Sequence, residues 1–153
     1  MNLFGLLDLS GSAMTAERER AEVVTSNMAN AETTRTPQGG PYRRQLVVFR
    51  AHRFPRFPML LASAGGESGL PSLGSRAARG VEVDQVIADP SPVIQRYQPG
   101  HPDADAKGYV SYPNINPVEE MTDLLGAVRS YQLNAAAVQA AKSMITESLD
   151  ILR

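Results

Sequence analysis

The chain has 153 residues, a length that predicts one domain, or one small domain with extended elements. Its 15 Lys and Arg residues balance 16 Asp and Glu residues, so no strong overall field favours binding to nucleic acid or to an anionic membrane. The sequence contains no cysteine, which excludes disulfides and thiolate chemistry.

The first predicted element is a helix over residues 3–31. Its apolar residues follow steps of three and four, which is the spacing of a coiled-coil seam, and Glu17 interrupts this seam. The apolar run at its start has no preceding Lys or Arg and is broken by Gly5 and Asp8. This run therefore predicts neither a cleavable signal peptide nor a membrane span.

The middle of the chain predicts short strands. Residues 42–51, 80–89, 93–98 and 108–112 are rich in β-branched or aromatic residues and are separated by Pro and Gly clusters. Residues 54–78 contain three prolines among Gly, Ser and Ala, which is typical of an irregular loop. We expect a sheet of three or four short strands, which buries little and is marginally stable by itself.

A second long helix is predicted from residue 117 to residue 153. Asn116 suits the N-cap and Pro117 the first helical position, while Glu119 and Glu120 lie near the positive end of the helix dipole. At 1.5 Å per residue this helix would be about 50 Å long, which exceeds the needs of a compact domain. Its apolar stripe also has coiled-coil spacing.

Two terminal helices with narrow apolar stripes can remove these stripes from water only by pairing with each other or with other copies. We expect an α+β fold in which residues 1–34 and 114–153 pair as an antiparallel coiled coil, with residues 35–113 forming a small β-rich module. Burial of the stripes roughly balances the cost of ordering the helices, so we expect the free monomer to fray at both ends and to order on assembly. The predicted assembly seam comprises Leu7, Met14, Ala21, Val24, Met28, Met121, Leu124, Val128, Tyr131, Ala135, Val138, Ile145 and Leu149.

The best candidate for a catalytic or metal site is the segment around His101, Asp103 and Asp105. The two aspartates match the first and third places of a calcium loop, but Lys107 and Asn114 stand where further ligands are required. The alternative interpretation is a turn in which the aspartates accept backbone N–H bonds. We favour the turn, and we predict no catalytic residue, no metal and no cofactor.

Three separated stretches resemble the flagellar basal-body rod proteins. Residues 26–49, SNMANAETTRTPQGGPYRRQLVVF, resemble the segment that follows the first helix in this family. Residues 89–121 are similar to the central segment of its proximal-rod type, and the last helix contains the family's Arg-x-Tyr-x-x-Asn pattern. The matching motif positions are Asn27, Ala29, Asn30, Ala31, Thr33, Arg129, Tyr131 and Asn134.

The resemblance implies a structural, non-enzymatic subunit of the proximal rod, the drive shaft that crosses the periplasm. It implies export by the flagellar type III apparatus without a cleaved signal, and assembly with copies of itself, other rod proteins and the adaptor that joins the rod to the MS ring. No nucleic acid or small-molecule substrate is expected.

The motif positions also have implied roles. Asn27, Asn30 and Thr33 would end the first helix, and Arg129, Tyr131 and Asn134 would lie at contacts within or between subunits. Two interpretations of Asn134 remain open, namely a seam residue that fixes register and a surface residue. The alternative function is a soluble coiled-coil adaptor, which would be an ordered dimer in isolation.

Overall fold

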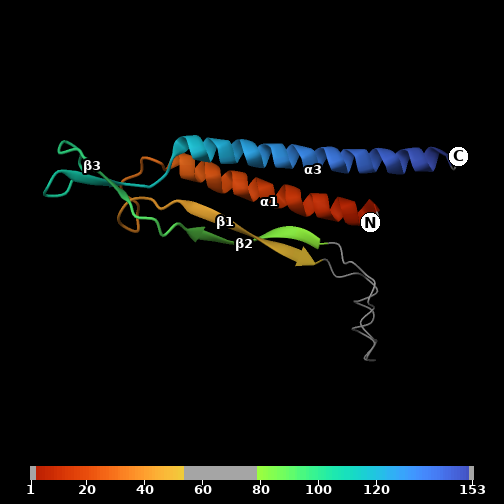
Figure 1. Ribbon diagram of the computed structural model, residues 1–153, viewed down its shortest axis with the longest axis horizontal. Helices are drawn as coiled ribbons and strands as arrows, with labels where there is room; N and C mark the ends of the chain where they lie inside the picture. Colours follow the sequence, from red (N-terminus) through yellow and green to blue (C-terminus); the bar gives the residue numbers. More distant parts are fainter. Residues whose placement is uncertain (1–2, 54–78, 152–153) are drawn as a thin grey trace, which may run out of the picture.

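The computed structural model describes residues 3–53 and 79–151 of the chain, which form an elongated molecule (Figure 1). Two long helices, α1 (Leu3–Ala29) and α3 (Pro117–Ile151), lie side by side and contact each other. Both ends of the chain lie at the same end of the molecule, so the two helices run in opposite directions. The α+β class and the two terminal helices predicted from the sequence are confirmed.

The start of α3 follows the predicted capping chemistry. The Asn116 side-chain oxygen accepts a hydrogen bond from the backbone N–H of Val118 at 3.1 Å, and its amide donates to the Glu119 carboxylate at 3.2 Å. The first bond satisfies a backbone N–H that a helix N-terminus otherwise leaves unpaired, and the second holds the Asn116 side chain beside Glu119. The N-cap prediction is therefore confirmed, and Pro117 occupies the first helical position.

Four strands form two separate antiparallel pairs among the described residues. Strand β1 (Gln45–Arg53) pairs with β2 (Arg79–Ala88), and β3 (Ile94–Tyr97) pairs with β4 (Tyr109–Tyr112). The first pair runs in register from Gln45 opposite Ala88 to Arg53 opposite Arg79, with a bulge between Val48 and Phe49. The second pair runs from Ile94 opposite Tyr112 to Tyr97 opposite Tyr109.

The expectation of one sheet of three or four strands is wrong for the described part of the chain. The connection from β2 to β3 contains Pro90 and Pro92, which have no backbone N–H to donate to a ladder. Strands β1 and β2 instead pack on α1, and the Ser12 hydroxyl accepts a hydrogen bond from the Val81 N–H at 3.2 Å. The helix therefore covers this sheet in place of further strands.

The elements form three layers, with α1 between α3 and the β1–β2 pair, while β3 and β4 project beyond the helices at the end opposite the termini (Figure 1). Small side chains dominate the buried surface between the helices, including Ala16, Ala127 and Ala141. Small side chains let helices approach closely but bury little apolar area. Neither described helix has both the length and the apolar character needed to span a membrane.

Candidate functional site

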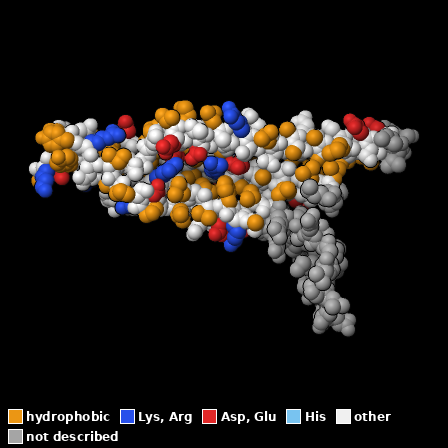
Figure 2. Space-filling model, viewed as in Figure 1, with side chains coloured by type: hydrophobic (Ala, Val, Ile, Leu, Met, Phe, Trp, Pro, Cys, Tyr) orange, Lys and Arg blue, Asp and Glu red, His pale blue; other side chains and the backbone are white. Residues whose placement is uncertain are grey.

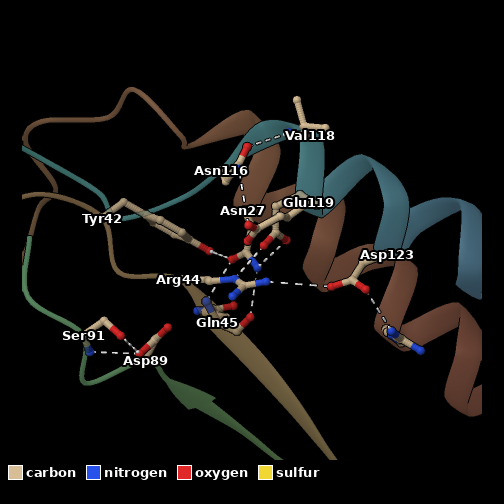
Figure 3. A network of polar contacts seen from close by, with 12 residues as sticks. Asn27, Tyr42, Arg44, Gln45, Asp89, Ser91, Asn116, Val118, Glu119 and Asp123 are labelled. Carbon is tan, nitrogen blue, oxygen red and sulfur yellow. Dashed lines mark hydrogen bonds and ion pairs between the residues drawn. The ribbon is translucent and has the colours of Figure 1, made fainter. Parts of the chain in front are cut away.

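The most deeply buried polar side chains lie where the end of α1, the start of α3 and the start of β1 meet (Figure 3). We call this group the polar junction, and it comprises Arg20, Asn27, Arg44, Glu120 and Asp123. Its members come from α1, from the segment before β1 and from α3. Asn27 and Glu120 are each only 1% exposed, so their hydrogen-bond partners determine whether their burial is favourable.

Asn27 bonds to the backbone of Gln45 much as a neighbouring strand would. Its amide donates to the Gln45 carbonyl at 2.9 Å, and its side-chain oxygen accepts from the Gln45 N–H at 2.9 Å. The same amide donates to Glu120 at 3.1 Å, and the Tyr42 hydroxyl donates to the Asn27 oxygen at 3.1 Å. Asn27 therefore joins α1 to the first residue of β1 and to α3.

Glu120 is a buried carboxylate whose charge is paired. Its Oε1 atom accepts a hydrogen bond from Arg44 Nε at 2.6 Å, and its Oε2 atom accepts from Asn27. Arg44 Nη2 lies 3.8 Å from Asp123, and Asp123 accepts from Arg20 Nη2 at 3.3 Å. Opposite charges thus alternate from α3 to α1, and each buried charge has a partner, as burial of ionised groups requires.

The end of α1 is held by the other motif residues before β1. The Asn30 amide donates to the Ser26 carbonyl at 2.9 Å, and the Thr33 hydroxyl donates to the Asn30 side chain at 3.2 Å. The Thr33 carbonyl then accepts from the Tyr42 N–H at 3.1 Å, while Ala31 lies in the turn between them. α1 ends at Ala29, two residues before the predicted end, because the chain turns here.

The motif residues of α3 lie apart from the polar junction. The Asn134 amide donates to the Ser130 carbonyl of its own helix at 2.9 Å, and its side chain is half-buried. Tyr131 and Arg129 are exposed, and Arg129 makes no hydrogen bond or ion pair within the described residues. The roles of these positions in contacts between subunits stay predictions.

The predicted assembly seam lies partly against α1 and partly on the surface. The buried residues of α3 among those described are Glu120, Ala127 and Ala141, at heptad spacing, and the first two lie one residue before Met121 and Val128. Sequence reasoning left Glu120 and Ala127 out of the seam because it followed the apolar residues one position later, although the heptad spacing was a usable signal. Of the seam residues, Val24 is buried; Leu7, Met14, Ala21, Met28, Leu124, Ala135, Val138 and Ile145 are half-buried; and Met121, Val128, Tyr131 and Leu149 are exposed.

The face of α3 that points away from α1 carries exposed apolar side chains. Val118, Met121, Leu125 and Val128 are 72, 54, 53 and 41% exposed, and their three-and-four spacing places them along one face. We call these four residues the outer ridge. Figure 2 shows hydrophobic side chains gathered over the start of α3. Apolar groups that gather on a surface in this way mark interaction sites.

The segment around His101 forms a turn, as favoured from the sequence. The Asp105 carboxylate accepts hydrogen bonds from the N–H groups of Lys107 and Tyr109, both at 2.8 Å. Asp103 accepts from the Thr34 hydroxyl at 2.9 Å, and His101 Nδ1 accepts from the Asp103 N–H at 3.1 Å. The turn interpretation is confirmed for Asp105, whereas the Asp103 carboxylate accepts from side chains and not from backbone N–H groups. No group of three metal-binding side chains occurs in the described ranges.

Asp89 lies beside the polar junction at the end of β2 (Figure 3). The Ser91 hydroxyl donates to its carboxylate at 2.6 Å and the Ser91 N–H donates at 2.9 Å. These two bonds lower the pKa of Asp89 from its ordinary value because they stabilise the ionised form. The Asp89 N–H also donates to the Arg44 carbonyl at 2.7 Å, which connects this turn to the junction.

Comparison with known proteins gives matches at both ends of the chain and over its full length. The family described as flagella basal body rod protein matches residues 7–35, and the family described as flagellar basal body rod FlgEFG protein C-terminal matches residues 106–151. These two ranges contain Asn27 and Glu120, the two buried residues of the polar junction.

Three curated relatives are each called flagellar basal-body rod protein FlgC. The chain is 37% identical to the protein of Borreliella burgdorferi over 163 residues, covering 100% of this chain and 99% of the relative. It is 40% identical to that of Bacillus subtilis over 155 residues, covering 99% of both chains. It is 39% identical to that of Yersinia enterocolitica over 151 residues, covering 99% of this chain and 98% of the relative.

The matches to these relatives run over nearly the full length of each chain, which agrees with the resemblance found in the sequence. The helix pair, the buried polar junction and the exposed apolar ridge agree with it as well. The chain belongs to the FlgC family of flagellar basal-body rod proteins and is a structural subunit of the bacterial flagellar rod, not an enzyme.

Proposed function

We propose that this rod subunit assembles through its terminal helices, which pair as an antiparallel coiled coil and lie in the proximal rod. Its partners are copies of itself, other rod proteins and the adaptor that joins the rod to the MS ring. The flagellar type III apparatus exports the chain to the periplasm without a cleaved signal. The names of the relatives and the contact between α1 and α3 support this proposal.

The outer ridge is the observation that carries the proposal. α3 is 35 residues long, and α1 is the only described element that makes extensive contact with it. Its opposite face exposes four large apolar side chains in one row. A monomer leaves this row in water, whereas a subunit of a polymer covers it with a neighbour.

Load transmission follows from this arrangement. Long helices that share their seams with neighbouring subunits resist torsion, because turning one subunit requires breaking contacts along a whole helix. The polar junction keeps α1, α3 and β1 in one fixed arrangement during this load. In this proposal residues 1–34 and 114–153 form the rod core, and residues 35–113 form the small β-rich module, whose strands β1 and β2 pack on α1. The loop predicted over residues 54–78 lies outside the described residues.

Leu124→Asp tests the assembly role of the helix pair. Leu124 is a half-buried seam residue, so a carboxylate there places a charge where the seam excludes water. In a strain that lacks the native subunit, we expect this variant to abolish swimming and to be missing from purified basal bodies. Leu133→Asp, at an exposed position of the same helix outside the outer ridge, is the matched control and should swim normally.

Circular dichroism of the purified Leu124→Asp chain shows whether the variant has lost its fold or only its assembly. If only assembly is lost, the signal of the strands should be kept. Normal swimming of the Leu124→Asp strain would show that the seam assignment is wrong. Sedimentation of the native chain distinguishes the soluble-adaptor alternative, because an adaptor would be a compact dimer in isolation.

A further inference from the structure

We propose that the outer ridge of one subunit docks into a groove between α1 and β1 of a second copy. This inference rests on the proposed assembly function and specifies which two surfaces meet. The structure offers a ridge and a groove on different faces of the same chain. When two different faces meet, each added copy leaves a free ridge or groove for the next, so the contact propagates as a ring or, where the rotation does not close, as an open helical polymer.

The four side chains of the ridge are apolar, and its second half, from residue 124 to Val128, is free of charge, whereas its first half also carries the exposed Glu119 and the half-exposed Asp123. Between Asp123 and Lys142, the only charged residue of α3 is Arg129. In Figure 3 the Val118 side chain points away from the polar junction. The ridge from Val118 to Val128 is about 15 Å long at the rise of an α-helix.

The groove has a volume of about 310 Å³, and residues of the polar junction line part of it. Val23 of α1 and Leu46, Val47 and Phe49 of β1 supply apolar walls, and Phe49 is 38% exposed. The β1 side of the groove, from Gln45 to Phe49, is about 13 Å long at the rise of a β-strand, which matches the ridge. Figure 2 shows charged side chains in the middle of the molecule with hydrophobic ones beside them.

Charge favours the same pairing. Arg20, Arg44, Glu120 and Asp123 line the groove and their formal charges cancel, while Glu17, which lies 3.8 Å from Arg20, leaves an excess negative charge at one end. Arg129 follows the ridge by one residue and has no partner within the described part of its own chain. If the second copy's ridge lies in the groove with Val128 toward Arg20, Arg129 of that copy comes next to Glu17 of the first. This charge complementarity favours another copy of the chain as the occupant of the groove.

Engineered cysteines test the contact directly because the chain has no cysteine of its own. Leu125→Cys on the ridge and Phe49→Cys in the groove are expressed together, as two tagged copies, in a strain that lacks the native subunit. Purified basal bodies are oxidised with copper-phenanthroline, and a disulfide forms only where the two Cα atoms approach within about 7 Å. We expect a crosslinked dimer that contains both tags.

Three controls make the outcome decisive. Each single variant alone should stay uncrosslinked, and a dimer from Leu125→Cys alone would overturn the proposal because it would show that ridge meets ridge. Leu133→Cys, exposed on α3 but outside the ridge, should not crosslink to Phe49→Cys. No crosslink between Leu125→Cys and Phe49→Cys, in basal bodies that contain both copies, would also overturn it.

Swimming of the same strains separates this proposal from the proposed function. Incorporation and swimming without the crosslink would reject the ridge–groove contact and leave the rod function intact. If the first pair is not incorporated, Met121→Cys with Leu46→Cys provides the same measurement at a second point along the groove. Failure of this pair to crosslink when incorporated would reject the contact in the same way.

Discussion

The two ends of the helix pair are held together by different means. At the polar junction, Asn27 and Glu120 are buried and bonded in fixed directions to Gln45 and Arg44. Towards the termini the helices meet through small side chains such as Ala141, which is 0% exposed, while Leu149 remains 62% exposed. Directional bonds fix the register of the helices at the junction, whereas the far end has little buried area to stabilise it.

Glu120→Ala should produce the largest loss of stability. The variant leaves Arg44 without its buried partner, and we expect the free energy of unfolding to fall by about 3 kcal/mol. Urea denaturation of the purified chain, followed by circular dichroism, measures this change. Glu147→Ala removes an exposed glutamate at the far end of α3 and should change stability by less than about 0.5 kcal/mol. Equal effects of the two variants would contradict the difference between the ends.

Asn27→Ala should have the next largest effect. It leaves the N–H and carbonyl groups of Gln45 without their side-chain partner, so we expect a loss of about 2 kcal/mol in the same denaturation experiment. Asn134→Ala is the matched control, because within residues 3–53 and 79–151 its amide bonds only to its own helix. If the control were as costly as Asn27→Ala, the bonds to β1 would not be what stabilises the junction.

Ala141→Leu should open the far end while the junction stays closed. The larger side chain cannot fit between the helices, but this end can separate locally, so we expect a loss of only about 1 kcal/mol. Hydrogen exchange should show faster exchange in residues 135–151 and unchanged protection near Glu120. Ala140→Leu, at the neighbouring exposed position, should leave exchange unaltered. Loss of protection at both ends would show that the helix pair opens as one unit.

Ser91→Ala should have the smallest effect, at the exposed rim of the junction. Folding lowers the pKa of Asp89, so the ionised Asp89 carboxylate stabilises the fold. This stabilisation is fully present above the pKa that Asp89 has in the unfolded chain, and it is lost as the pH falls through the lower pKa of the folded chain. Removal of the hydroxyl should raise the pKa of Asp89 toward its ordinary value, which a carboxyl NMR titration measures. The swim phenotype should not change. A pKa of Asp89 that stays the same would show that the Ser91 hydroxyl is not what lowers it.

The elements of the fold were predictable because local sequence encodes them. Apolar spacing located both helices, the Asn116 cap located the start of α3, and β-branched runs located the strands. The separation into two sheets was missed, although Pro90 and Pro92 interrupt the chain between them. The prediction had no means of recognising that α1 would take the place of a neighbouring strand.

The polar junction was beyond sequence reasoning because its pairs are distant along the chain. Asn27 and Glu120 are 93 residues apart, and Arg44 and Glu120 are 76 residues apart. No periodic pattern connects such positions. The sequence placed Glu120 near the helix dipole, which agrees with its place in the first turn of α3, but gave no sign of its burial. The family motif did single out Asn27, which bonds to Gln45, Glu120 and Tyr42.

The separation between Asn27 and Glu120 also has a kinetic consequence. A contact between residues 93 positions apart closes a long loop, and folding slows as such non-local contacts dominate a structure. The junction cannot close until nearly four-fifths of the chain has been synthesised, so α1 spends that time without its partner helix. Any chaperone or transport factor that acts during synthesis therefore meets α1 as an unpaired segment.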